Sequence, residues 1–204
     1  MNKHKKTVSY VFGAGRLKKL TSGEKIASNY RFRTGSITKT FTSTIILQLM
    51  EEGSLKLEDS FLNCVQNDET KKLLLEILFC ETINCSSQIT VKNLLQHKSG
   101  LRDCFADDER FFADIKKYPN RDWNWNNILE KYFKYNLHKK GLFKPGESFY
   151  YSDTNYVLLA IIIEEITSKK YSEVLEERIL NPLSLNDTYL EFHQNKKGFI
   201  PIIF

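Results

Sequence analysis

"FRTGSITKTFTSTIILQLMEEG", residues 32–53, is the segment from which we infer the architecture of the whole chain. Its apolar side chains recur at intervals of three and four residues, at Ile37, Phe41, Ile45 and Leu49. This spacing predicts an amphipathic helix that begins near Thr34, and Gly53 is a typical C-terminal cap. Ser36 and Lys39 would then lie at the start of this helix. Their spacing has two possible interpretations, one functional and one structural.

Ser36 and Lys39 could form a nucleophile and its base. A serine hydroxyl needs a neighbouring base to accept its proton, and residues i and i+3 share one helix face. Burial would lower the pKa of Lys39 until a neutral amine could serve as that base. The other interpretation is a polar residue near a helix start beside a solvated lysine, because the same Ser-x-x-Lys spacing recurs at Ser22 and Lys25 in an expected turn.

A second segment, "FKPGESFYYSDTNYVLLAIIIEEIT" at residues 143–167, gives the functional interpretation more weight. It places Tyr151 in a loop directly before a helix that is apolar nearly all round, as expected for a buried helix. Tyr151 could relay a proton at a site near that helix. Alternatively, Tyr151 is a buried tyrosine, and Asp153 or Thr154 caps the helix.

The remaining segments predict a mostly helical chain with strands at its beginning. Residues 8–33 carry short strand-like pieces around a turn at Thr21-Ser22-Gly23. Further helices are expected over residues 69–79, from Val91 into the Ser99-Gly100 turn, over 121–138, and from Ser172 to a stop at Pro182. Without repeats or a Pro/Gly-rich linker, the simplest organisation is a single continuous domain.

Three blocks, taken in order, resemble the serine β-lactamase family: residues 32–61, "ITVKNLLQHKSGLRD" at 89–103, and residues 145–190. The similarity is greatest to its class C-like branch, which includes D-alanyl-D-alanine carboxypeptidases, penicillin-binding proteins and related esterases. The resemblance implies an α/β (α+β) fold of the β-lactamase/transpeptidase type, with a helical region packed on an antiparallel sheet. Residues 1–33 would be its N-terminal strand region and 34–204 the mostly helical part.

The resemblance also implies roles for individual residues. Ser36 would be acylated, Lys39 would help to deprotonate it, and Tyr151 would carry the proton to the leaving group. Asp153 stands where many relatives have a substrate-binding asparagine, and nearby Asn155 is a second candidate for that contact. The substrate would be a small molecule or peptide, such as a peptidoglycan stem peptide, a β-lactam or an ester. Neither a metal nor a cofactor is implied.

One element of the family pattern is missing, the Lys-Thr-Gly or His-x-Gly strand that follows the tyrosine motif. Residues 97–100, "HKSG", correspond instead to an earlier loop. We therefore expect an incomplete, truncated domain over 1–204, with little or no turnover and an exposed sheet edge that favours self-association. The alternative to a serine hydrolase is a non-catalytic remnant, or a pseudoenzyme that binds peptidoglycan peptide or a protein partner.

Composition excludes several other classes of protein. The net charge of +5 is concentrated at the N-terminal end, but no aromatic interleaving accompanies it, so nucleic-acid binding is not expected. The longest apolar run, residues 157–163, is too short to span a membrane. The four cysteines lack a Cys-x-x-Cys pair and are expected as free thiols. The first residues are not a convincing signal peptide, so the compartment stays open although family members commonly act outside the cytoplasm.

Overall fold

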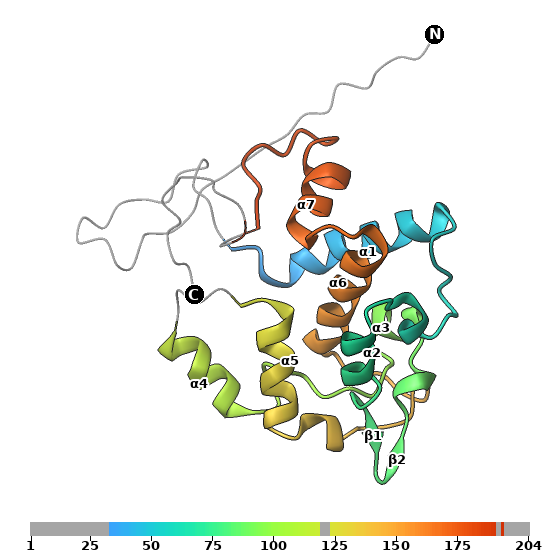
Figure 1. Cartoon of the computed structure of the whole chain (residues 1–204). Coiled ribbons are helices and arrows are strands. Elements are labelled where there is room, and N and C mark those ends of the chain that lie inside the picture. The colour runs from blue at the N-terminus through green and yellow to red at the C-terminus, as the bar shows by residue number, and fades with distance from the viewer. Residues whose placement is uncertain (1–32, 119–122, 191–192, 194–204) are drawn as a thin grey trace, which may run out of the picture. The chain divides into compact units, whose positions relative to one another are not determined.

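The computed structural model describes residues 33–118, 123–190 and 193, and the described residues from Ser36 onward form one compact unit. This unit is largely helical (Figure 1). The α-helices are α1 (Thr38–Glu51), α2 (Asp68–Leu74), α3 (Val91–Leu95), α4 (Glu109–Lys117), α5 (Trp125–Lys134), α6 (Asp153–Thr167) and α7 (Tyr171–Leu175). Short helical turns are η1 (Gly35–Ile37), η2 (Phe61–Cys64), η3 (Ser86–Gln88), η4 (Leu137–Lys139) and the π-helical η5 (Glu176–Leu180).

The helix expected after Ser36 is confirmed as α1, with a difference at its start. Gly35 takes a left-handed φ of +55°, which glycine adopts without steric cost, and the chain then makes the 3-10 turn η1 before α1 begins. Ser36 therefore lies in this tighter turn and not in the α-helix. At the other end, Gly53 has a φ of +77° and follows the last turn, as expected of a C-terminal cap.

Helix α6 forms the centre of the hydrophobic core. It packs against α1, α3, α5 and α7, which surround it in Figure 1. Leu158, Leu159, Ile162 and Ile163 are completely buried, and full burial of one such side chain contributes about 1.5–3 kcal/mol. The nearly all-apolar sequence of α6 is therefore explained by burial, as predicted, and the start of α6 lies beside α1.

The helix predicted over 69–79 is shorter than expected. Helix α2 ends at Leu74, and Phe79–Cys80 (β1) pairs antiparallel with Ile83–Asn84 (β2) in a two-stranded hairpin. The Asn84 side chain donates to the Leu75 carbonyl at 2.7 Å, and the Cys85 amide donates to the Leu78 carbonyl at 2.9 Å. In a longer helix these two carbonyls would accept hydrogen bonds from the helix itself. Here they accept from Asn84 and Cys85 of the next segment, and the helix ends earlier.

Two differences concern the region before α6. Residues 121–122 of the helix expected over 121–138 lie outside the described residues, and the rest contains α5 followed by the separate turn η4, because Asn136 adopts a left-handed φ of +57° between them. Helix α4 was not predicted from the sequence. It begins after Asp108, whose carboxylate accepts from the Arg110 amide at 3.0 Å, and it buries Phe111 in the core.

Other sequence predictions have mixed outcomes. The helices from Val91 and before Pro182 are confirmed as α3 and as α7 continued by η5. All four cysteines are buried free thiols, as expected. No helix in the described ranges is both long and apolar enough to cross a membrane. The strands predicted within residues 8–33 lie outside the described residues.

Candidate active site

Ser36 and Lys39 meet at the start of α1. Lys39 Nζ donates to Ser36 Oγ at 3.4 Å. Residues i and i+3 lie on one face of a helical segment, so the turn η1 and the first turn of α1 place both side chains on the same side. The hydroxyl also lies beside the positive end of the α1 dipole, which favours negative charge.

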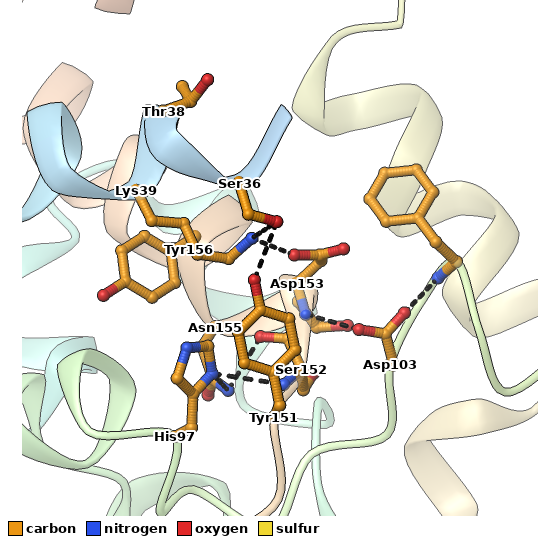
Figure 2. A network of polar contacts seen from close by, with 12 residues as sticks. Ser36, Thr38, Lys39, His97, Asp103, Tyr151, Ser152, Asp153, Asn155 and Tyr156 are labelled. Carbon is orange, nitrogen blue, oxygen red and sulfur yellow. Dashed lines mark hydrogen bonds and ion pairs between the residues drawn. The ribbon is translucent and has the colours of Figure 1, made fainter. Parts of the chain in front are cut away.

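Tyr151 reaches the same oxygen from a distant part of the chain. Its hydroxyl donates to Ser36 Oγ at 2.9 Å (Figure 2). The segment before it is fastened to the loop at residues 97–100: Tyr150 N donates to His97 O at 3.0 Å, and Gly146 N donates to Lys98 O at 2.8 Å. Because these backbone bonds position the segment, Tyr151 meets Ser36 even though its side chain is 45% exposed.

Asp153, the first residue of α6, forms an ion pair with Lys39. Lys39 Nζ donates to Asp153 Oδ1, and the side chains are 16% and 30% exposed, respectively. Figure 2 shows Nζ between Ser36 Oγ and this carboxylate. One ammonium group thus contacts both the candidate nucleophile and an acid.

The expected low pKa of Lys39 is wrong for this arrangement. Burial is the largest single influence and does lower the pKa of Lys39, but hydrogen bonds to Asp153 and Tyr151, together with the charge of Asp153, outweigh it. The pKa therefore lies above the ordinary value for lysine, and the resting side chain is an ammonium ion. The carboxylate partner, 114 residues away, is responsible for the difference.

His97 supports the site from behind Tyr151, and sequence reasoning assigned it no role. Its imidazole stacks on the Tyr151 ring with centroids 4.4 Å apart. Ser152 N donates to His97 Nδ1 at 3.2 Å, and Asn155 Nδ2 lies 3.2 Å from the same nitrogen. With two donors facing Nδ1, the ring proton belongs on Nε2. Burial, followed by the nearby charge of Lys39, lowers the pKa of His97, which keeps the ring neutral.

Asn155 does not face the candidate nucleophile with a free amide. The residue is completely buried. Its Oδ1 accepts from Ser99 Oγ at 2.5 Å, and its Nδ2 donates to Ser152 O at 3.0 Å. This geometry offers no support for the expected substrate contact, because both ends of the amide bind the protein itself.

The start of α6 is capped by a residue from another loop and not by Asp153 or Thr154. Asp103 is buried, and its Oδ2 accepts from the Asp153 amide at 2.6 Å. Thr154 Oγ1 donates to Arg102 O at 2.7 Å. A carboxylate at a helix N-terminus is electrostatically favourable. The loop at 102–103 therefore orients Asp153 toward Lys39.

A cavity of about 710 Å³ opens beside this cluster. Tyr151 and Asp153 line one side, and the opposite side is formed by the loop before α4 and by α4 itself. The residues contributed by that opposite side are Phe105, Ala106, Glu109, Phe112, Ala113 and Lys116. The volume and the mainly apolar wall are typical of a small-molecule pocket.

Comparison with known proteins agrees with the geometry. A family model described as Beta-lactamase matches residues 4–197. Penicillin-binding protein 4* of Bacillus subtilis (strain 168) is 28% identical over 172 residues, which cover 83% of this chain and 32% of that protein. The chain spans about a third of the length of the curated relatives it matches.

Solved structures of similar proteins support the same fold. A D-stereospecific amidohydrolase from Streptomyces sp. has a TM-score of 0.64 at 31% identity, covering 78% of this chain and 44% of that one. The D-amino acid amidase from Ochrobactrum anthropi SV3 in complex with L-phenylalanine amide has a TM-score of 0.64 at 25% identity, covering 86% of this chain and 43% of that one. The β-lactamase/transpeptidase-like fold expected from the sequence is confirmed.

Proposed function

Because the chain belongs to the Beta-lactamase family, we propose that it is a serine hydrolase in which Ser36 attacks the carbonyl carbon of an amide or ester and becomes acylated. The observation that carries the proposal is the convergence of two proton-handling groups on one hydroxyl. Ser36 Oγ lies 3.4 Å from Lys39 Nζ and 2.9 Å from the Tyr151 hydroxyl. Both distances suit proton transfer with small movements.

In this mechanism each residue has a separate task. As the new C–O bond forms, the Ser36 proton leaves toward Lys39, whose ammonium group must release one of its own protons to accept it. Tyr151 donates a proton to the departing nitrogen or oxygen. The positive end of α1 supports the negative charge that develops on the carbonyl oxygen. Water then hydrolyses the acyl-enzyme and releases the acid.

The cavity next to Tyr151 and Asp153 supports a small-molecule or short-peptide substrate. The amidohydrolase and amidase among the similar structures favour an amide, and the penicillin-binding relative favours a peptidoglycan stem peptide or a β-lactam. Asp153 would face this substrate as a hydrogen-bond acceptor only, since a carboxylate has no N–H to donate. For Asn155 we propose an internal, positioning role.

Covalent labelling tests the proposal. The chain is incubated with a fluorescent penicillin and, separately, with a p-nitrophenyl ester, and the adduct is located by mass spectrometry. We expect the label on Ser36 and its loss in Ser36→Ala. Ser22→Ala is a matched control, because Ser22 has the same spacing to Lys25. A label that survives in Ser36→Ala, or no adduct with either probe, would overturn the assignment and favour a binding protein.

A further inference from the structure

Asp153 gives the candidate site a chemical property that an amide at this position would lack. An asparagine can share a hydrogen bond with a lysine, but it has no basic group at neutral pH, whereas an aspartate can take the proton itself. Lys39 Nζ donates both to Asp153 Oδ1 and to Ser36 Oγ. A continuous path for protons therefore leads from Ser36 through Lys39 to a carboxylate.

We propose that Asp153 is the terminal proton acceptor of the site, which receives a proton from Lys39 while Lys39 receives the proton of Ser36. This inference rests on the proposed function and identifies where the proton goes. It resolves a difficulty in the site, since an ammonium group has no lone pair with which to accept a proton. The carboxylate provides the lone pair, and the lysine transmits the proton.

The step balances in protons and charge. Before acylation the groups are a serine hydroxyl, a lysine ammonium and an aspartate carboxylate. During the attack the Oγ–H bond breaks, Nζ gains that proton and gives another to Oδ1, and the O–C bond to the substrate forms. The negative charge of Asp153 has then moved to the tetrahedral oxyanion. When the leaving group departs with its bonding electron pair, Tyr151 protonates it and recovers a proton from Lys39, which recovers one from Asp153.

The surroundings of Asp153 favour this exchange. Its amide is fixed by the Asp103 carboxylate, so the side chain is presented to Lys39 by a buried network. Lys39 is its ion-pair partner, and Tyr151 lines the same cavity. The other titratable or charged groups that face it from the packed elements and across the cavity are His97, Asp103, Cys104, Glu109 and Lys116.

The decisive experiment is the pH dependence of Ser36 acylation in the parent and in Asp153→Asn. The probe is p-nitrophenyl acetate, followed as a single-turnover burst with the Ser36→Ala rate subtracted. Because p-nitrophenolate departs without needing a proton, the profile reports only on deprotonation of Ser36. With Asp153 as the acceptor, the acid limb of the parent is set by a group that Asp153→Asn lacks. In Asp153→Asn it should move toward higher pH by at least about two units, since free carboxyl and ammonium groups titrate about six units apart.

The opposite shift would overturn the inference. If Asp153 merely holds Lys39 as a cation, removing its charge makes the amine easier to deprotonate, and the acid limb of Asp153→Asn stays in place or moves to lower pH. Asp114→Asn is a matched control, because it removes the carboxylate of another lysine–aspartate–tyrosine cluster, with Lys131 and Tyr135. This control should leave the profile unchanged.

Two further measurements keep the test independent of folding and of the proposed function. Asp153→Glu retains a carboxylate, so its acid limb should lie near that of the parent, and a limb like that of Asp153→Asn would count against the relay. If Asp153→Asn fails to fold, as judged by circular dichroism, Asp153→Ala takes its place in the same assay, with the same shift to higher pH expected for the relay and a limb that stays in place or moves to lower pH counting against it. A parent with no Ser36 adduct at any pH would overturn the proposed function itself, an outcome distinct from a labelled parent with the wrong pH shift.

Discussion

The imidazole of His97 stacks on the phenol ring of Tyr151, with centroids 4.4 Å apart and planes inclined by 27°. The contact matters because Tyr151 is 45% exposed and would otherwise rotate freely. One face of the ring is held by His97, and the hydroxyl is left to donate to Ser36 Oγ. A loop residue thus acquires the orientation that proton transfer needs.

Tyr151→Phe should lower the rate at which an amide substrate acylates Ser36 by about 10²- to 10⁴-fold, the usual contribution of a positioned acid or base, because the departing nitrogen needs a proton. The fold should persist, because the phenyl ring keeps its contact with His97. Tyr150→Phe is the matched control: the hydroxyl of Tyr150 donates to Asp107 at 2.5 Å and not to Ser36. Stopped-flow acylation rates would separate the two variants, and equal losses in both would remove Tyr151 from the mechanism.

Lys39→Arg should abolish acylation although it preserves the positive charge. A guanidinium group can still pair with Asp153, but it does not lose a proton in the accessible pH range. We expect a rate at least about 10²-fold lower, with a melting temperature close to that of the parent. Lys131→Arg, in the second lysine–aspartate pair, should acylate normally. If Lys39→Arg reacts as fast as the parent, the lysine does not transfer the proton.

His97→Asn should remove part of the acid sensitivity of the fold. Since burial lowers the pKa of His97, the folded state prefers the neutral ring. The free energy of unfolding that depends on the neutral ring is fully present above the pKa of His97 in the unfolded chain, about 6.5. It is lost as the pH falls through the lower pKa that His97 has in the folded protein. Asparagine tolerates the left-handed φ of +56° at this position and cannot titrate.

The measurement for His97→Asn is the melting temperature of both proteins between pH 8 and pH 4. Only the difference between the curves is assigned to His97, because burial lowers the pKa of His138 as well. The parent should lose more stability than the variant on acidification. Parallel curves would show that protonation of His97 does not oppose folding.

Gly100→Ala should be strongly destabilising. Gly100 has a φ of +82°, and an added Cβ would lie 2.0 Å from the Phe143 carbonyl oxygen. Left-handed strain and the backbone clash together should cost about 2–5 kcal/mol, and separating these loops should also displace Tyr151. Gly53→Ala is the control, since its φ is +77° but no atom lies within 4 Å of the added Cβ. Chemical denaturation should show a loss of only about 1–2 kcal/mol there, and equal losses would refute the clash.

Much of the helical framework could be predicted from local sequence. The spacing of apolar residues after Ser36 and the uninterrupted apolar run after Asp153 indicate α1 and α6, because both helices bury side chains at positions that the 3.6-residue repeat determines. The pairing of Ser36 with Lys39 follows from their separation of three residues. The position of Tyr151 before the buried helix suggested a proton relay, but its partnership with Ser36 and Lys39 came from the resemblance to a family.

Tertiary structure decided the protonation state of Lys39, the orientation of Asn155 and the length of several helices. Local sequence could not indicate that Asp153, 114 residues from Lys39, raises the pKa of that lysine, because electrostatic effects depend on distance in space. It could not show that Asn155 is turned into the core, nor that Asn84 ends the helix predicted up to Phe79. Periodicity reports which side chains avoid water. Which polar groups form hydrogen bonds with one another depends on how the helices pack. This packing brings together the side chains of Ser36, Lys39, Tyr151 and Asp153.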